Sequence, residues 1–438
     1  MNALNGMNRR DFLRTSTLAA AAVAASPALI TSHAAPDDPI RVGLIGCGGR
    51  GMGAIGNVLS AGPNIELVAI ADLFPEKVES ARKQLETGAQ SSASWARGTE
   101  TTELKDKIKI DPSLCFSGFD AYKKLLAVPN VNYVILTTPP HFRSIHLKAA
   151  IEAGKHCFIE KPVAVDVPGV KAVLAAGEMA KAKGLGILAG TQRRHQKNYQ
   201  EVVKRIQDGI IGKITAARAY WNQASHTQHE KRKTEWTDME WQLRNWIYFT
   251  WLSGDIIVEQ HMHNIDVINW VLGARPVKAY GMGGRQVRVG AEYGNIYDHF
   301  CVEFEYPGGV RLTSMCRQMD NCSDQIGEAV VGTKGVSNCM NNITGETNFR
   351  FSGKFRNPYE QEHVDMVESI RAGKPLNEAQ NVAESNMAAI MGRESAYCGK
   401  IIDWDTAMEN ENSLSPSKYE FGPLAVAPVP MPGKYKFE

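Results

Sequence analysis

Short apolar runs alternate with helix-like stretches between residues 40 and 189. The runs IRVGLIG at 40–46 and IELVAIA at 65–71 are almost wholly apolar, which is typical of strands buried on both faces of a sheet. Strands that alternate with helices predict a doubly wound parallel sheet. We expect its strands at 40–46, 65–71, 131–137, 155–160 and 186–189, and its helices at 51–59, 75–86, 119–126, 145–153 and 167–183.

After about residue 212 the apolar positions follow the pattern of a second sheet. Turns such as Pro307-Gly308-Gly309 separate several short strands, which favours antiparallel neighbours. We expect strands at 214–221, 277–282, 297–306, 310–317, 328–331 and 335–339, and helices at 254–272, 360–372 and 379–399. The predicted fold class is α/β, with an N-terminal doubly wound parallel sheet and a C-terminal α/β domain that has a large open, mainly antiparallel sheet.

These patterns divide the chain into domains. Residues 38–162 form the first domain, with a polar insertion at 88–118, and residues 163–410 form the second. We expect the late helix at 379–399 to pack back on the first domain. Residues 411–438 are irregular and rich in proline, and we expect this tail to wrap the body or a neighbouring subunit.

Residues 1–35 have the composition of a twin-arginine export signal. Arg9 and Arg10 precede an Ala-rich apolar run at 18–30, and small residues near Ala34 offer a cleavage point. The run is short for a membrane span, although an uncleaved anchor or a chance arginine pair stays open. Cleaved export predicts a periplasmic protein whose mature chain has no membrane span.

The charge balance and the cysteines exclude several classes of function. The formal net charge is +2, and the predicted signal carries this excess because it holds three arginines and one aspartate. A neutral mature chain argues against a nucleic-acid partner. The eight cysteines are scattered, with no CxxC pair or zinc spacing, so we predict mostly free thiols and no metal.

A glycine-rich turn follows the first strand. Gly46-Cys47-Gly48-Gly49-Arg50-Gly51 fits the G-x-G-x-x-G pattern, in the strand–helix context that dinucleotide binding requires. Its glycines permit a tight turn, approach of the backbone to a pyrophosphate, and close helix packing. The predicted cofactor contacts here are Gly46, Gly48, Gly49, Arg50 and Gly51.

Asp72 ends the next strand, where a carboxylate binds the adenosine ribose hydroxyls and repels a 2′-phosphate. NAD is therefore the favoured cofactor. NADP stays open because Arg50 has the charge to neutralise a phosphate.

A second loop, Thr137-Thr138-Pro139-Pro140-His141, follows the strand at 131–137. It lies at the carboxyl end of that strand, the edge where open α/β sheets bind ligands. The two prolines predict a stiff loop. Thr138, Pro139 and His141 are therefore candidate cofactor contacts, although an ordinary loop would have the same pattern.

Ile159-Glu160-Lys161-Pro162 is the third motif in this order. Together the three motifs resemble those of the glucose–fructose oxidoreductase / inositol dehydrogenase / MocA superfamily, over residues 40 to about 405. The resemblance implies a Rossmann domain joined to an α/β domain, with nicotinamide between the two. It also implies that Glu160 and Lys161 lie at the cofactor. Lys161 would lower the pKa of the reacting hydroxyl or stabilise negative charge on its oxygen.

The expected helix at 254–272 carries a second cluster of chemical residues. The family pattern is an acid, a His four residues on and an Asp three beyond, which Glu259, His263 and Asp266 match. Positions i, i+4 and i+7 share one helix face. The resemblance implies that His263 accepts the proton of a sugar hydroxyl, and that Glu259 or Asp266 holds its tautomer or binds a second hydroxyl. The predicted catalytic residues are Lys161, His263 and Glu259.

Two departures from the family pattern affect the expected proton relay. Glu259 replaces a commoner Asp, and His261 stands where many members have Gly. His261 is expected to line the substrate pocket.

Polar and aromatic residues beyond the strand at 186–189 supply substrate candidates. Planar arginine donors suit vicinal hydroxyls or a carboxylate, and aromatic faces stack on sugar rings. Structural ion pairs explain the arginines equally well, and core or subunit packing explains the aromatic residues equally well. The candidate substrate contacts are Arg193, Arg194, His195, Tyr199, Trp246, His261 and Asp266.

These features predict an exported, NAD-dependent oxidoreductase that acts on a hydroxyl of a carbohydrate or polyol. Free NAD is scarce outside the cytoplasm, so a tightly held cofactor is expected, and the twin-arginine route exports folded proteins. A redox-neutral glycoside hydrolase or lyase, acting through a transient keto-sugar, is the alternative. A non-catalytic NAD-dependent sugar sensor is a third. The open sheet of the family implies a homo-oligomer.

Overall fold

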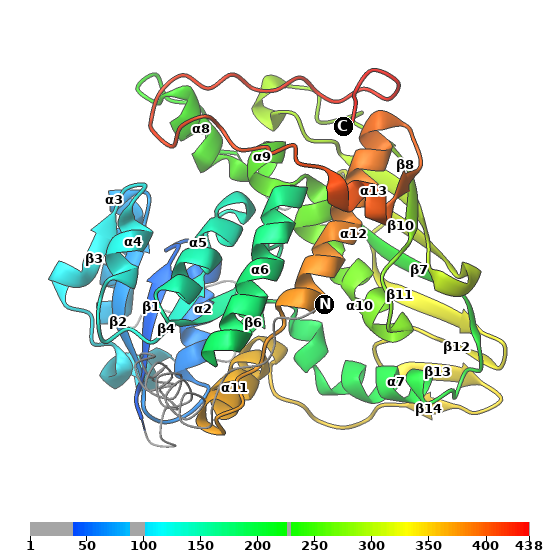
Figure 1. The fold of residues 1–438 in the computed structure, drawn as a ribbon, viewed down its shortest axis with the longest axis horizontal. Coiled ribbons are helices and arrows are strands. Elements are labelled where there is room, and N and C mark those ends of the chain that lie inside the picture. Colours follow the sequence, from blue (N-terminus) through cyan, green and yellow to red (C-terminus); the bar gives the residue numbers. More distant parts are fainter. Residues whose placement is uncertain (1–37, 88–100, 226–228, 438) are drawn as a thin grey trace, which may run out of the picture. The chain divides into compact units, whose positions relative to one another are not determined.

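Six parallel strands form the first sheet, in the order β3-β2-β1-β4-β5-β6 (Figure 1). They are β1 (Ile40–Ile45), β2 (Ile65–Asp72), β3 (Cys115–Ser117), β4 (Tyr133–Leu136), β5 (His156–Ile159) and β6 (Ile187–Ala189). The computed structural model describes residues 38–87, 101–225 and 229–437, so the predicted export signal lies outside the described residues. Leu44 and Ile45 of β1 join apolar clusters on opposite faces, which explains the continuous apolar runs.

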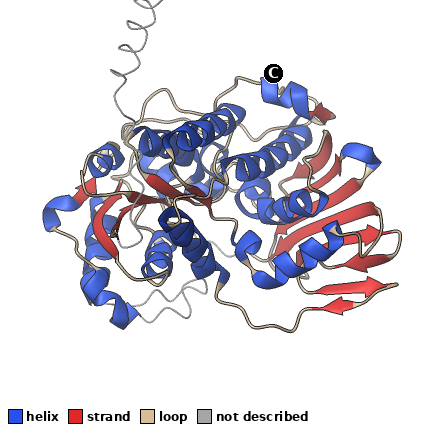
Figure 2. Cartoon of the chain, turned by 60° about the horizontal axis from the view of Figure 1, so that its bottom comes forward, coloured by secondary structure: helices blue, strands red, loops and turns tan. Residues whose placement is uncertain are grey.

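Helices cover both faces of this parallel sheet (Figure 2). On one face lie α4 (Ala121–Leu126), α5 (Pro140–Glu152) and α6 (Val167–Lys183), and on the other lie α2 (Gly49–Leu59), α3 (Pro75–Thr87) and α11 (Pro358–Arg371). Helix α11 comes from a distant part of the sequence, and its buried Met366 and Val367 complete the second layer. The predicted doubly wound Rossmann arrangement is confirmed.

Nine strands form the second sheet, in the order β14-β13-β12-β11-β7-β10-β9-β8-β15. They are β7 (Ile214–Gln223), β8 (Lys278–Gly284), β9 (His299–Glu305), β10 (Arg311–Gln318), β11 (Gln325–Gly332), β12 (Gly335–Ser337), β13 (Asn342–Gly345), β14 (Phe349–Arg350) and β15 (Ile402–Asp403). Only β7 and β10 pair in parallel among these described strands. The predicted large, mainly antiparallel sheet is also confirmed.

Helices α10 (Met262–Leu272) and α12 (Ala379–Cys398) cover one face of the second sheet. The approach is close at β8, where a Cβ atom on Gly281 would lie 2.8 Å from the carbonyl oxygen of Gly392 in α12. Asn386 of α12 also accepts a hydrogen bond from the backbone N–H of Val163 at 2.8 Å. Helix α12 therefore joins the second sheet to the segment that follows the Glu-Lys-Pro motif.

Two local elements differ from the expected ones. The helix expected at 145–153 begins at Pro140, with Pro139 at the N-cap, so the expected stiff loop is already the first turn of α5. The helix expected at 254–272 consists of a π-helical turn, Ile257–His261, followed by α10. A π-helical turn adds a residue to the turn and so changes which side chains share a face.

The strand expected at 186–189 is β6, so the parallel sheet extends past residue 162, where the first domain was expected to end. The polar stretch 88–118, expected as an insertion, includes the edge strand β3. Residues 88–100 of that stretch lie outside the described residues. The chain further contains α7 (Lys197–Gln207), α8 (Asp238–Arg244), α9 (Thr250–Ser253) and α13 (Trp404–Glu409). Within the described ranges, every helix is too short or too polar to cross a membrane.

Candidate active site and cofactor pocket

The glycine turn between β1 and α2 has the shape that a dinucleotide requires. Gly46 has a φ of +108°, and a Cβ atom on Gly51 would lie only 2.0 Å from the carbonyl oxygen of Gly46. A Cβ atom on Gly48, in contrast, would meet no atom within 4 Å. The first and last glycines therefore permit the turn and its packing, while Gly48 leaves open space for a ligand.

The N-terminus of α2 is free to face a phosphate. Gly48 is the N-cap, no side chain caps the helix, and the first turn carries no acidic residue. The exposed N–H groups and the helix dipole there favour a negative charge. These features fit a nicotinamide dinucleotide bound through its pyrophosphate.

Asp72 lies beside this turn at the end of β2. Its carboxylate accepts hydrogen bonds from the backbone N–H of Cys47 at 2.8 Å and of Phe74 at 3.0 Å. Burial raises the pKa of the Asp72 carboxyl, and the two backbone hydrogen bonds oppose that shift. Each carboxylate oxygen keeps a lone pair for a ribose hydroxyl.

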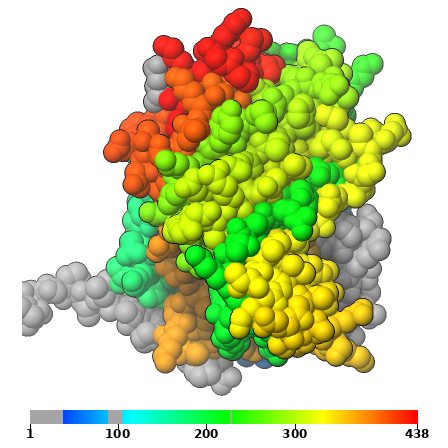
Figure 3. Space-filling view, turned by 90° about the vertical axis from the view of Figure 1, so that its right-hand side faces the viewer, coloured from blue at the N-terminus to red at the C-terminus, as the bar shows by residue number. Residues whose placement is uncertain are grey.

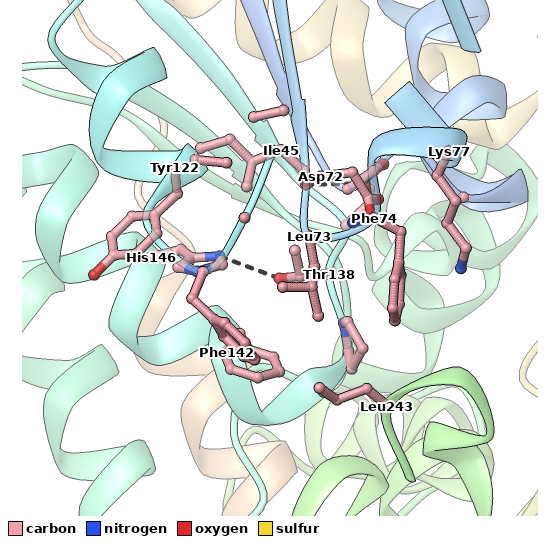
Figure 4. A pocket seen from close by; sticks show the side chains of 18 of the residues that line it. Ile45, Asp72, Leu73, Phe74, Lys77, Tyr122, Thr138, Phe142, His146 and Leu243 are labelled. Carbon is pink, nitrogen blue, oxygen red and sulfur yellow. Dashed lines mark hydrogen bonds between the residues drawn. The ribbon is translucent and has the colours of Figure 1, made fainter. Parts of the chain in front are cut away.

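A pocket opens between Asp72 and the second domain (Figure 4). Gly46, Gly48, Thr138 and Pro139 line it, as predicted for cofactor contacts. Sequence reasoning missed the apolar and aromatic part of the lining, which has no motif of its own: Leu73, Phe74, Phe119, Tyr122, Phe142, His146 and Leu243. Trp246, predicted to touch substrate, also lines this pocket. The pocket therefore suits a flat, largely apolar group next to the Asp72 carboxylate.

Arg50, predicted as a cofactor contact, is not among the residues that line this pocket. Its guanidinium Nε lies 2.5 Å from Glu160 Oε1 and its Nη2 lies 3.5 Å from Glu362 Oε1, and its charge also lies over the rings of Phe158 and Tyr359. Burial alone would lower the pKa of Arg50, but the neighbouring carboxylates raise it. The structure therefore places Arg50 and Glu160 in a buried charge cluster behind the glycine turn.

The three predicted catalytic residues lie together at the junction of the two domains. Lys161 Nζ donates to the Glu259 carbonyl oxygen at 2.5 Å and lies 3.5 Å from Glu259 Oε1. Burial lowers the pKa of His263 well below its ordinary value, and the positive charges of Lys161 and Arg193 add to the shift. His263 is therefore a neutral imidazole at neutral pH, able to accept a proton.

The aromatic face next to His263 comes from β7. The Trp221 ring lies 5.7 Å from the His263 ring at an interplanar angle of 22°, and the Arg193 guanidinium lies 5.6 Å from the Trp221 ring. The buried atoms Trp221 Nε1 and Glu259 Oε2 have no hydrogen-bond partner among the described residues. A donor and an acceptor without partners, beside Lys161 and His263, suit a ligand rich in hydroxyl groups.

The remaining predicted substrate contacts are held by protein carboxylates or hydroxyls. Arg194 pairs with Asp266, whose carboxylate also accepts from Ser385 at 2.8 Å. His195 lies 2.6 Å from Asp365 and 3.1 Å from Glu378. Burial alone would lower the pKa of His195, but these two carboxylates raise it to about 10.

Three further predicted residues are similarly engaged. Tyr199 donates to Glu328 at 3.2 Å, and the His261 ring lies 2.7 Å from the Ser314 hydroxyl. The His141 ring, predicted at the cofactor, lies 2.8 Å from the hydroxyl of Tyr419 in the C-terminal tail. The structure thus brings Lys161, Glu259 and His263 together, and hydrogen-bonds these other side chains to neighbouring protein groups.

The described residues contain no group of three His, Cys, Asp or Glu side chains that could hold a metal ion. The eight cysteines, all within the described ranges, are free thiols.

Two family models match the chain. Residues 40–187 match the oxidoreductase family with an NAD-binding Rossmann fold (GFO_IDH_MocA), and residues 199–337 match the GFO/IDH/MocA C-terminal domain. Among solved structures, an aldose-aldose oxidoreductase from Caulobacter crescentus has a TM-score of 0.64 at 17% sequence identity, covering 83% of this chain and 99% of that one. At this identity the structural likeness concerns the fold.

Curated relatives match part of the chain. It is 28% identical over 236 residues to an inositol 2-dehydrogenase/D-chiro-inositol 3-dehydrogenase of Halalkalibacterium halodurans, covering 53% of each chain. It is 27% identical over 230 residues to a glycosyl hydrolase family 109 protein of Shewanella pealeana, covering 49% of this chain and 45% of that one. The chain thus spans about half the length of these two relatives. The family models match both domains, including the NAD(P)-binding Rossmann domain. The protein therefore belongs to the Gfo/Idh/MocA oxidoreductase family.

Proposed function

We propose that this protein is an NAD-dependent oxidoreductase that oxidises or reduces a hydroxyl group of a carbohydrate or polyol. The observation that carries the proposal is that Lys161 of the Rossmann domain binds Glu259 of the second domain, where its positive charge acts on the buried His263. The similarity to an inositol dehydrogenase supports a polyol substrate. The unpartnered Trp221 Nε1 and Glu259 Oε2 support a ligand with several hydroxyl groups.

The bound nicotinamide would supply the hydride acceptor, and the residues of the chain would manage the proton. As the carbinol C–H bond breaks, the hydroxyl proton moves to a ring nitrogen of His263, which is neutral because burial lowers its pKa. The Lys161 ammonium stabilises the negative charge that develops on the oxygen. Glu259 holds Lys161 in place through its carbonyl oxygen and carboxylate. Reduction of a ketone runs through the same steps in reverse.

We propose NAD rather than NADP because of Asp72. Its carboxylate lines the cofactor pocket, whereas Arg50 is engaged by Glu160 and Glu362. We further propose that the protein is exported to the periplasm with its cofactor bound tightly, on the strength of the twin-arginine pattern at Arg9 and Arg10.

A redox-neutral glycoside hydrolase or lyase is the second candidate. The similarity to a glycosyl hydrolase family 109 protein favours it. Such a reaction uses the same hydride and proton transfers twice, in opposite directions, so the same residues serve it. It leaves no net change in the cofactor, which suits a protein that carries its NAD with it.

Cofactor content and substrate class can be tested together. Purified mature protein is denatured, and the released NAD(H) and NADP(H) are measured by chromatography. We expect close to one NAD(H) per chain. Turnover is then measured with paired sugars or polyols and with glycosides. Product oxidation state separates net oxidoreduction from redox-neutral cleavage.

The Lys161→Ala variant separates an enzyme from a sensor. We expect it to retain NAD and to lose turnover by about a hundredfold or more, because it lacks the charge that stabilises the oxyanion. Failure of the wild-type protein to bind either dinucleotide would refute the proposed function. Unchanged physiological behaviour of the Lys161→Ala variant would favour a non-catalytic sensor.

A further inference from the structure

The C-terminal tail, residues 411–437, contains no helix or strand but makes specific contacts along its length. Its beginning is fixed at α6, where the backbone N–H of Leu414 donates to Asp166 Oδ2 at 2.8 Å. Its end is fixed at α12, where the Tyr435 hydroxyl donates to Glu394 at 2.8 Å. The stretch between these two anchors passes the cofactor pocket.

One part of the tail contacts the Rossmann wall of that pocket. The Phe421 ring lies 6.2 Å from the Phe74 ring and 5.1 Å from the Phe119 ring. Both Phe74 and Phe119 line the pocket (Figure 4 shows Phe74). Two residues earlier, the Tyr419 hydroxyl lies 2.8 Å from His141, at the start of α5. The tail therefore packs against Phe74 and Phe119, two residues of the pocket wall.

The next residues of the tail contact the opposite wall. The Gly422 carbonyl oxygen accepts from the Met239 N–H at 3.1 Å, and the Leu424 carbonyl oxygen accepts from Gln242 Nε2 at 2.8 Å. Both partners lie on α8, which also carries the pocket residue Leu243. Within four residues, Phe421 to Leu424, the tail passes from the Rossmann wall to the wall supplied by the second domain.

An ion pair between α8 and the Rossmann domain supports the same closure. Arg244 of α8 lies 2.7 Å from Glu76, and its guanidinium lies 4.0 Å from the Phe74 ring. Phe74 is thus contacted by the second domain through Arg244 and by the tail through Phe421. Moving the two walls apart requires these contacts to break.

We propose that residues 419–424 are part of the cofactor site, where they clamp its two walls together and slow the release of the dinucleotide. The proposal rests on the proposed function only for the identity of that ligand. A cofactor that leaves between the walls must wait for the tail to detach. These contacts therefore lower the rate at which the dinucleotide dissociates. Residues 419–424 thus belong to the cofactor-binding site, although no sequence motif marks them.

The test compares cofactor release in tail variants. Phe421 is about half exposed, so Phe421→Ala removes its ring contacts without opening the core. We expect NADH to dissociate about tenfold faster from Phe421→Ala, as the loss of two aromatic contacts implies. Tyr419→Phe removes a single oxygen and should give a smaller increase. Release is followed by the loss of NADH fluorescence on mixing with excess NAD.

A matched control uses the far end of the same tail. Tyr435→Phe removes the anchor on Glu394, which does not line the cofactor pocket, and should leave NADH release unchanged. Equal release rates in the wild type, Phe421→Ala and Tyr419→Phe would overturn the proposal while leaving the oxidoreductase assignment intact. Absence of NADH binding in the wild type would instead refute the proposed function.

Discussion

At the scale of single residues, the charges around the cofactor pocket favour an unphosphorylated adenosine ribose. Asp72 lines the pocket, and the cation that shares the lining is Lys77, whose ammonium lies 5.3 Å from the Phe74 ring. The Arg50 charge is neutralised by Glu160. The Asp72 carboxylate would therefore repel a 2′-phosphate, the Arg50 guanidinium is already paired, and Lys77 is left as the lining cation that could offset this repulsion.

Removing the Asp72 charge should shift cofactor preference. Asp72→Asn keeps the size and an acceptor for one backbone N–H but abolishes the repulsion of a 2′-phosphate. We expect the ratio of NAD to NADP affinity to fall by about tenfold, measured as dissociation constants for both reduced cofactors. Glu79→Gln, which removes an exposed carboxylate of α3 paired with Arg82, is the control and should leave the ratio unchanged. An unaltered ratio in Asp72→Asn would show that Asp72 does not select the cofactor.

The pH dependence of turnover should report on His263. Burial and the charge of Lys161 lower the pKa of His263. The imidazole therefore stays unprotonated when the pH is lowered to about 6.5, the ordinary pKa of histidine. Protonation removes the acceptor, and kcat/KM should therefore fall only at pH values below 6.5. The His263→Asn variant should bind cofactor and show little activity at any pH. An acidic limb centred at or above pH 6.5 would contradict this role of His263.

The sequence indicated which residues are candidates for the site, but it did not indicate which of them are held by partners elsewhere in the chain. Lys161, Glu259 and His263 were predictable because each lies in a recognisable motif. Arg194 and His195 carried the same polar signal, yet they are held by carboxylates of Asp266 and Glu378. Asp266 lies on α10 and Glu378 at the N-cap of α12, both far along the chain from Arg194 and His195. The pairing therefore depends on tertiary packing, which no local sequence pattern reveals.

At the scale of elements, strands and helices with strong local signals were predicted well. The strand, glycine turn and helix from Ile40 to Leu59 form a local unit whose apolar and glycine pattern agrees with the structure. The π-helical turn Ile257–His261 was not predictable, because its sequence has the same apolar spacing as an α-helix. Helix α8, which supplies the second pocket wall, is only seven residues long and gives a weak periodic signal.

Two glycines of the same turn should separate folding from cofactor binding. Gly51→Ala places a Cβ atom 2.0 Å from a backbone oxygen, so we expect it to lower the free energy of unfolding by about 1–3 kcal/mol or more. Gly48→Ala meets no protein atom within 4 Å and should leave that free energy unchanged. It should nevertheless weaken NADH binding, because its methyl group enters the space left for the pyrophosphate.

Chemical denaturation and NADH titration of both variants check this prediction. The two glycines differ by three positions in one turn, so each variant serves as the control for the other. Equal losses of stability in Gly48→Ala and Gly51→Ala, or full NADH affinity in Gly48→Ala, would show that the open space at Gly48 is not the ligand site.

At the scale of the whole molecule, the described part of the chain covers one face of the second sheet and leaves the other face uncovered. On the uncovered face, Met282, Cys301, Met315 and Tyr220 lie side by side across four neighbouring strands. Met282 is 63% exposed and Met315 is 37% exposed. Figure 3 looks onto this side, whose surface is formed largely by the green to yellow part of the chain that contains the strands of the second sheet. An apolar row of this kind is typical of a surface that another protein chain covers.

We therefore propose that two copies of the chain associate through this sheet face. Met282→Lys places a positive charge in the apolar row. Burying this charge in an interface without an opposite charge would cost free energy of association, so we expect the variant to be monomeric. Light scattering coupled to size-exclusion chromatography measures the change. Val426→Lys makes the same change at an exposed position of the tail and should leave the mass unaltered. A wild-type protein that is monomeric at micromolar concentration would refute the oligomer, whereas an oligomer that survives Met282→Lys would place its interface elsewhere.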